Sequence, residues 1–292
     1  MNKLATCLLC IAATCTSLTL LAQQQKANNN NSLLWKISGN HLAKPSYVFG
    51  TMHAICQGDV VWPQTIDESL SHSDRLCLEM NMSDPKVIAA ATDGFIDLSG
   101  KKLSDYFTPA QYKALTAYFH DSLNMDLALF QQLKPLALMS VAAMKEGNCE
   151  HLVSYEDSLM KIASKETKEI CGLEQAQEQL DILNTMPIDS VINQIMDQVQ
   201  DRNKNDSEYQ QLIVAYKNQD LVALSGLIAD SKELGNDPAI FLDDRNKKWI
   251  PRMEGFMNGK SVFFAVGAGH LWGQNGVINL LRSAGYTVEP QQ

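Results

Sequence analysis

Short apolar runs lie near both ends of the chain, and a long region of helical periodicity separates them. Near the beginning, LLWKISG and PSYVFGTMH are rich in β-branched and aromatic residues and are separated by NHLAK, which predicts a hairpin of two strands. RLCLEM (75–80) follows a short predicted helix and adds a third strand. Near the end, SVFFAVGAGH predicts a buried strand, NGVINLLRSAG an amphipathic helix and YTVEP a final short strand.

The residues between these two regions predict helices. TPAQYKALTAYF opens with Thr108 as an N-cap and Pro109 at the first helical position, and apolar residues follow on one face. Two further apolar stripes repeat at helical spacing, at 191–199 and 221–228. We expect all three stripes to face a core, as amphipathic helices do. The exception in this region is KEICGLE (168–174), a brief strand-like run.

This order of elements predicts an α/β (α+β) fold. We expect one central mixed sheet built from the N- and C-terminal parts of the chain, with the helical middle block forming a cap. The sheet and the cap together form a single expected domain over 33–290, in which the helical insertion covers about 105–255. A polar linker at 23–32 precedes this domain.

The first 22 residues predict a secretory signal peptide. Lys3 stands ahead of an uncharged apolar stretch that ends at Ala22, and polar residues follow. We therefore expect an exported protein, periplasmic or extracellular. Two alternatives are an uncleaved membrane anchor that tethers the N-terminus, because 4–22 is nearly long enough to span a bilayer, and a lipoprotein signal at Cys15. No other apolar run approaches that length, so we expect no membrane span in the mature chain.

Charge and cysteine content narrow the classes of partner and site. The formal net charge is −9, from 24 Lys and Arg against 33 Asp and Glu, and an acidic surface repels nucleic acid phosphates. After removal of the signal peptide four cysteines remain, Cys56, Cys77, Cys149 and Cys171, and they allow three pairings. We predict a disulfide between Cys149 and Cys171. None of the four has Cys-x-x-Cys spacing, so a zinc knuckle or thioredoxin motif is unsupported.

The same Gly-x-x-His pattern follows an apolar run near each end of the chain. His53 ends GTMH and His270 ends GAGH, each just beyond a predicted buried strand. Ligands of open α/β sheets bind at the carboxyl ends of strands, and glycine there allows a tight turn and close approach. Glu79 closes a third apolar strand in the same way, and a buried acid needs a cation, a donor or a metal. The alternative for each histidine is a hydrogen-bonded structural residue.

Histidine and glutamate side chains are common ligands of divalent metal ions in proteins. Two imidazoles and a carboxylate can hold a divalent ion such as Mn²⁺, Co²⁺ or Zn²⁺ and leave positions open for water, so we predict His53, Glu79 and His270 as metal ligands. Glu174 is a candidate general base or fourth ligand, and its alternative is a charge at a helix N-terminus. Arg245 is a candidate clamp for a carboxylate or an oxyanion, and its alternative is a surface ion pair.

Several of these segments also resemble a known family. LLWKISG and SYVFGTMH, LCLEMN, CGLEQAQEQL, DDRNKKW and FFAVGAGHLWGQNGVINLLRSAGYTVEP occur in the order of the TraB/GumN family, which is similar to the Tiki metalloproteases of animals. The resemblance implies a fold shared with erythromycin-esterase and ChaN-like proteins and, for the Tiki branch, a divalent-metal-dependent peptidase activity. It puts the two family histidines on His53 and His270 and the strand glutamate on Glu79. Gln175 stands where the family often has threonine, which leaves the start of the next helix open.

The sequence therefore predicts an exported metal-dependent hydrolase, a peptidase, that acts on a peptide or small-molecule substrate. Two other functions fit the same residues. One is a ligand-binding protein that holds a haem-type ligand in the same cleft without turnover. The other is a metal-free esterase-like hydrolase in which His53 or His270 serves as general base.

Overall fold

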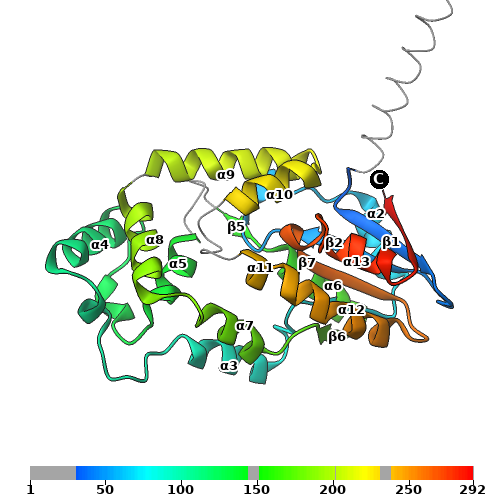
Figure 1. Cartoon of the computed structure of the whole chain (residues 1–292), viewed down its shortest axis with the longest axis horizontal. Helices are drawn as coiled ribbons and strands as arrows, with labels where there is room; N and C mark the ends of the chain where they lie inside the picture. The colour runs from blue at the N-terminus through cyan, green and yellow to red at the C-terminus, as the bar shows by residue number, and fades with distance from the viewer. Residues whose placement is uncertain (1–30, 144–150, 201, 231–237, 292) are drawn as a thin grey trace, which may run out of the picture.

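A computed structural model describes residues 31–143, 151–200, 202–230 and 238–291. The sheet lies at one end of the molecule, and a group of helices from the middle of the chain lies at the other end (Figure 1). The predicted signal peptide, 1–22, is outside the described residues. Within the described part of the chain, no helix has the length and apolar character needed to cross a membrane.

Six strands form one mixed sheet, which confirms the predicted fold class. They are β1 (Leu34–Gly39), β2 (Ser46–Thr51), β4 (Arg75–Leu78), β6 (Glu169–Gly172), β7 (Val262–Gly267) and β8 (Tyr286–Gln291), in the order β6-β4-β7-β2-β1-β8. β1 pairs antiparallel with β2, as the predicted hairpin requires, and with β8. β2 pairs parallel with β7, β7 with β4, and β4 with β6. β3 (Ile55–Cys56) and β5 (Leu152–Val153) form a separate antiparallel pair.

Helices cover the sheet and fill the middle of the chain. Thr108 is the N-cap of α4, and its Oγ1 accepts a hydrogen bond from the Gln111 N–H at 3.3 Å, as the sequence predicts. The described helices are α2 (Gln64–Ser71), α3 (Pro85–Gly94), α4 (Pro109–Asp121), α5 (Pro135–Ala143), α6 (Tyr155–Lys165), α7 (Ala176–Leu183), α8 (Ile188–Gln200), α9 (Arg202–Lys217), α10 (Leu221–Asp230), α11 (Pro238–Phe241), α12 (Asp243–Met257) and α13 (Val277–Ser283).

Two hydrophobic cores hold these elements together. The larger one surrounds the sheet and includes Phe263 and Trp249, together with residues of α6, α9, α10 and α12. The smaller one joins Phe119 of α4, Leu138 of α5 and Ile195 of α8. The three predicted apolar stripes face these cores, as expected. Only part of the helical middle block therefore packs as a separate unit, because α6, α9, α10 and α12 contribute residues to the core around the sheet.

The predicted disulfide between Cys149 and Cys171 is wrong, because Cys171 is a free thiol. Cys171 lies in β6 directly opposite Cys77 of β4, and its Sγ contacts the Leu76 carbonyl at 3.5 Å. Cys56 is disulfide-bonded, and Cys149 is outside the described residues. The spacing of two cysteines in the sequence does not show that one of them lies in a strand of the sheet and is paired there with another residue.

Gly50 allows β2 to pass close to the segment that follows β7. A Cβ atom at this position would lie 2.7 Å from Leu271 Cδ1 and 3.1 Å from the Ala268 Cα. The Gly50 carbonyl also accepts a hydrogen bond from the Tyr216 hydroxyl at 2.9 Å, which fixes the strand in place. The backbone around β2 therefore cannot shift freely to make room for a side chain.

We predict that Gly50→Ala lowers the free energy of unfolding by about 1–3 kcal/mol, the usual cost of overpacking a filled core. The control is Gly58→Ala, because a Cβ there meets no heavy atom within 4 Å. We expect a change of no more than about 0.5 kcal/mol for the control. Urea denaturation followed by circular dichroism measures both, and equal effects of the two substitutions would contradict the close approach.

Candidate functional site

The four strands that pair in parallel bring the predicted residues to one edge of the sheet. His53 follows β2, Glu79 follows β4, Glu174 follows β6 and His270 follows β7. Parallel strands end at the same edge, so side chains just beyond their carboxyl ends converge. Arg245 reaches the same place from α12. All five predicted residues therefore lie in one region, although their roles do not follow from that alone.

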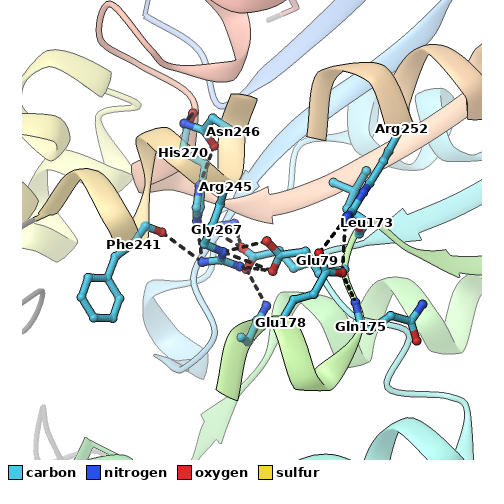
Figure 2. A network of polar contacts seen from close by, with 12 residues as sticks. Glu79, Leu173, Gln175, Glu178, Phe241, Arg245, Asn246, Arg252, Gly267 and His270 are labelled. Carbon is cyan, nitrogen blue, oxygen red and sulfur yellow. Dashed lines mark hydrogen bonds and ion pairs between the residues drawn. The ribbon is translucent and has the colours of Figure 1, made fainter. Parts of the chain in front are cut away.

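Glu79 is a buried carboxylate held at both oxygens. Its Oε1 accepts the Gly267 N–H at 2.7 Å, and its Oε2 accepts Arg245 Nη2 at 2.5 Å (Figure 2). Burial raises the pKa of Glu79, but His270, which is charged only at the low pH where Glu79 would titrate, together with Arg245, His53 and the Gly267 N–H, outweighs burial and holds the pKa below its ordinary value. Glu79 is consequently ionised at neutral pH and needs the cation that faces it.

Arg245 is the cation that joins Glu79, Glu174 and His270 in one network of contacts. Its Nε donates to Glu174 Oε1 at 3.0 Å and its Nη2 donates to Glu174 Oε2 at 2.9 Å, which is a two-point contact between the planar groups. Only 12% of the Arg245 side chain and 2% of the Glu174 side chain are exposed. The two form a buried pair rather than a surface one. Arg245 Nη1 also approaches His270 Nε2 at 3.2 Å.

His270 is buried in the short helix η6 (Ala268–His270) that follows β7. Its Nδ1 lies 2.7 Å from Asn246 Oδ1, and its Nε2 lies 3.8 Å from Glu79 Oε1. Burial lowers the pKa of His270 to about 3, although the Glu79 charge opposes the shift. The ring is therefore neutral at physiological pH and can act as an acceptor or a ligand.

His53 differs from His270 because its side chain is 69% exposed. Its Nδ1 lies 2.9 Å from Glu156 Oε1, and this hydrogen bond, with a smaller contribution from the charge of Glu79, raises the pKa of His53 to about 9, although neighbouring protein atoms remove part of the water around the ring and oppose the shift. Glu156 in turn accepts from the Thr51 hydroxyl at the same oxygen and from the Ser154 hydroxyl at Oε2, 2.8 Å away. The carboxylate that orients His53 is thus itself held in place.

Gly267 lies where the two histidines and Glu79 converge. A Cβ atom on Gly267 would lie 3.3 Å from Glu79 Oε1, 3.7 Å from His270 Cδ2 and 3.8 Å from His53 Nε2. A side chain at this position would therefore project among the three predicted ligands. The glycine that ends β7 keeps the space between them free of protein atoms at that point.

Glu156 and Asn246 belong to the site but were missed by reasoning from the sequence. Glu156 lies 103 residues from His53 in the chain, in the first turn of α6, and no local motif marks it. Asn246 directly follows Arg245 in DDRNKKW, and this position beside a candidate site residue is the one feature of the sequence that could have indicated its role. Gln175, whose effect on the following helix was open, is the N-cap of α7, and its N–H donates to Glu178 Oε2 at 3.0 Å.

The side chains of the site are not arranged here as they would be around a metal ion. Among the described residues, no group of three or more His, Cys, Asp or Glu side chains could hold a metal ion without rearrangement. The guanidinium of Arg245 lies between Glu79, Glu174 and His270 instead. Three carboxylates, Glu79, Glu156 and Glu174, face two positive groups, Arg245 and protonated His53, which leaves an excess of negative charge.

Comparison with known proteins confirms the resemblance. Residues 33–290 match the TraB/PrgY/gumN family. The chain is 24% identical to Metalloprotease TIKI1 of Danio rerio over 317 residues, which cover 89% of this chain and 63% of the relative. It is also 24% identical to Metalloprotease TIKI2 of Xenopus tropicalis (89% of this chain, 60% of the relative) and to Metalloprotease TIKI1 of Homo sapiens (89% and 62%). The chain spans less than two thirds of these relatives, and no solved structure matches it.

We predict that Arg245→Ala lowers the free energy of unfolding by about 3–5 kcal/mol, because it leaves Glu79 and Glu174 as buried charges without their partner. Lys247→Ala on the same helix is the control. Lys247 forms an exposed pair with Asp244 at 3.4 Å, so its loss should change stability by less than about 0.5 kcal/mol. Guanidinium denaturation of both variants makes the comparison, and a small effect of Arg245→Ala would show that the network contributes little to stability.

Proposed function

Because the chain belongs to the TraB/PrgY/gumN family, we propose that it is an exported divalent-metal-dependent hydrolase that cleaves peptides. Its metal ligands are His53, Glu79 and His270, and Mn²⁺, Co²⁺ and Zn²⁺ are the candidate ions. The observation that carries the proposal is the convergence of these three side chains around Gly267. The relatives named as metalloproteases support a peptide as the substrate.

The nitrogen and oxygen atoms of His53, His270 and Glu79 are chemically suitable ligands for a divalent ion. Each histidine contacts a partner through Nδ1, Glu156 for His53 and Asn246 for His270, which leaves Nε2 for the site. His53 would release its Nε2 proton on binding an ion. Metal-ligating histidines usually have such a partner on the other ring nitrogen, because it fixes the orientation of the ring. Two imidazole nitrogens and one carboxylate are a common set for Zn²⁺ and related ions. The excess of negative charge in the site favours a further cation as well.

Arg245 and an ion would compete for the same acceptors. Arg245 donates to Glu79 Oε2 and lies 3.2 Å from His270 Nε2, so both contacts must be given up when these atoms bind a metal. Glu174 offers Arg245 a position that does not depend on Glu79, through the contact at Nε. We therefore assign Glu174 the role of holding Arg245, in preference to general base or fourth ligand. Arg245 would then direct Nη1 at a substrate carbonyl oxygen or carboxylate.

A bound divalent ion would polarise the scissile carbonyl and lower the pKa of a water molecule. The residues of the chain supply the rest of the site. His53 is the exposed member of the set, so the substrate approaches from its side, whereas His270 and Glu79 are buried behind it. Arg245 contributes positive charge where negative charge develops on the substrate during hydrolysis.

Metal-free hydrolysis is the second candidate, and one observation favours it. His53 and Glu156 form an imidazole–carboxylate pair at 2.9 Å, and the His53 ring is exposed, which is the arrangement of a general base oriented by a carboxylate. Because the pKa of His53 is raised to about 9, the ring is a base only after it loses its proton, so metal-free hydrolysis should increase as the pH rises towards 9. In that case His53 and Glu156 carry the reaction, and His270 and Glu79 only hold Arg245 in place. The two candidates differ in whether hydrolysis requires a bound divalent ion.

We predict that His53→Ala and His270→Ala each abolish binding of Mn²⁺, Co²⁺ and Zn²⁺ while the fold is retained, because two protein ligands hold such an ion poorly against water. Glu79→Gln should weaken binding less completely, since the amide oxygen can still coordinate. Metal stoichiometry by mass spectrometry, together with circular dichroism, measures these effects.

His120→Ala is the control, because His120 is exposed on α4 and contacts only Asp121 among the contacts described. It should keep the wild-type stoichiometry. If wild type binds none of the three ions, the metal-dependent proposal fails. Hydrolysis that then persists in chelator and requires His53 and Glu156 would support the metal-free candidate instead.

A further inference from the structure

Asn246 is a buried amide whose polar atoms all have partners. It lies on α12 with 1% of its surface exposed. Its Nδ2 donates to the Asn275 carbonyl at 2.9 Å and to the His270 carbonyl at 3.3 Å, and its Oδ1 lies 2.7 Å from His270 Nδ1. A buried amide without such partners would be costly, so these contacts fix how the group is oriented.

The two carbonyl contacts determine which atom of the amide faces His270. Only the NH₂ group can donate to the carbonyl oxygens of Asn275 and His270. Turning the amide over would set its oxygen against both carbonyls and leave them unpaired in the interior. Oδ1 must therefore face the ring, and because an amide oxygen only accepts, His270 Nδ1 must carry the hydrogen.

The other ring nitrogen leads independently to the same result. Arg245 Nη1 lies 3.2 Å from His270 Nε2, and a guanidinium has donors but no acceptor. Nε2 must then be the acceptor, with its lone pair directed into the site (Figure 2). One partner requires a hydrogen on Nδ1 and the other requires none on Nε2, so both require the same tautomer.

A further contact fixes the position of Asn246 itself. Asn275, whose carbonyl accepts from Asn246, donates through its own Nδ2 to Asp243 Oδ2 at 2.7 Å. Asp243 is the first residue of α12. The segment after η6 is thereby tied to the helix at two points, one turn apart, and the amide of Asn246 lies between that segment and His270.

We propose that Asn246 is a positioning residue that holds His270 as the Nδ1–H tautomer and directs the Nε2 lone pair at whatever cation the site contains. In the present structure that cation is Arg245. The role deepens the proposed function, and in that part rests on it, since the same lone pair would bind a divalent ion. The tautomer itself is independent of the metal.

The first test is the tautomer in the metal-free protein. Two-bond ¹H–¹⁵N correlation spectra of ¹⁵N-histidine-labelled protein distinguish a protonated Nδ1 from a protonated Nε2. For wild type at neutral pH we expect the His270 ring with the hydrogen on Nδ1. A hydrogen on Nε2, or on both nitrogens, would overturn the inference whether or not the protein binds metal.

The second test removes the amide. Asn246→Ala removes the acceptor of Nδ1 while Arg245 still faces Nε2, so the Nε2–H form should appear as a minor fraction beside the Nδ1–H form. The same variant should weaken binding of Mn²⁺ or Zn²⁺ by about 10- to 100-fold in calorimetry, the usual effect of losing such a partner. Asn246→Asp keeps an acceptor for Nδ1, so its folded fraction should retain the Nδ1–H form, although the second carboxylate oxygen faces the Asn275 and His270 carbonyls and should lower stability. The wild-type spectrum tests the tautomer if neither variant folds. The Nε2–H form in folded Asn246→Asp would contradict the proposal.

The matched control is Asn279→Ala. Asn279 also donates through Nδ2 to a carbonyl of the segment after η6, that of Gly273 at 2.7 Å, but the described contacts do not include His270. It should change neither the tautomer nor the affinity. A folded Asn246→Ala with both the wild-type tautomer and the wild-type affinity for Mn²⁺ or Zn²⁺ would overturn the positioning role. If the wild-type tautomer is as expected but no ion binds, the metal proposal fails and the positioning role stands.

Discussion

Parallel pairing of β2 with β7 and of β7 with β4 is the constraint on which the site depends. In this register Thr51 lies opposite Gly267 and Leu78 lies opposite Ala265, so the chain leaves all three strands at nearly the same level. His53, Glu79 and His270 follow within a few residues and have little freedom to separate. The hydrogen bond from the Gly267 N–H to Glu79 extends this pairing by one contact beyond the strands. The sheet thus brings together segments that are more than 200 residues apart.

The same geometry creates an electrostatic problem that the helices resolve. Carboxylates that follow adjacent parallel strands come close to one another, and Glu79 and Glu174 are both buried. α12 supplies Arg245, which contacts both of them, and Asn246, which contacts His270. α6 supplies Glu156 for His53. A helix from outside the sheet therefore supplies a partner for the Nδ1 atom of each histidine. The partner of the exposed His53 is a carboxylate, whereas the partner of the buried His270 is a neutral amide.

The sequence could predict the strands and the residues that follow them, because apolar runs and the glycine before each histidine are local features. The same reasoning extended to Glu79 and Glu174. It could not find Glu156, since the pairing of that residue with His53 depends on how α6 packs against β2, and no spacing in the chain records such packing. The same limit explains the wrong cysteine pair. Cys171 faces Cys77 because β6 pairs with β4, a relation that exists only in the folded sheet.

We propose that the three strand ends form one cation site, which Arg245 shares with a divalent ion. The most direct measurement is anomalous X-ray diffraction from crystals of the protein grown with Mn²⁺. We expect one anomalous peak bonded to Nε2 of His53, Nε2 of His270 and the Glu79 carboxylate, with Arg245 still on Glu174. No peak at this position, with Arg245 still joined to both Glu79 and His270, would contradict it.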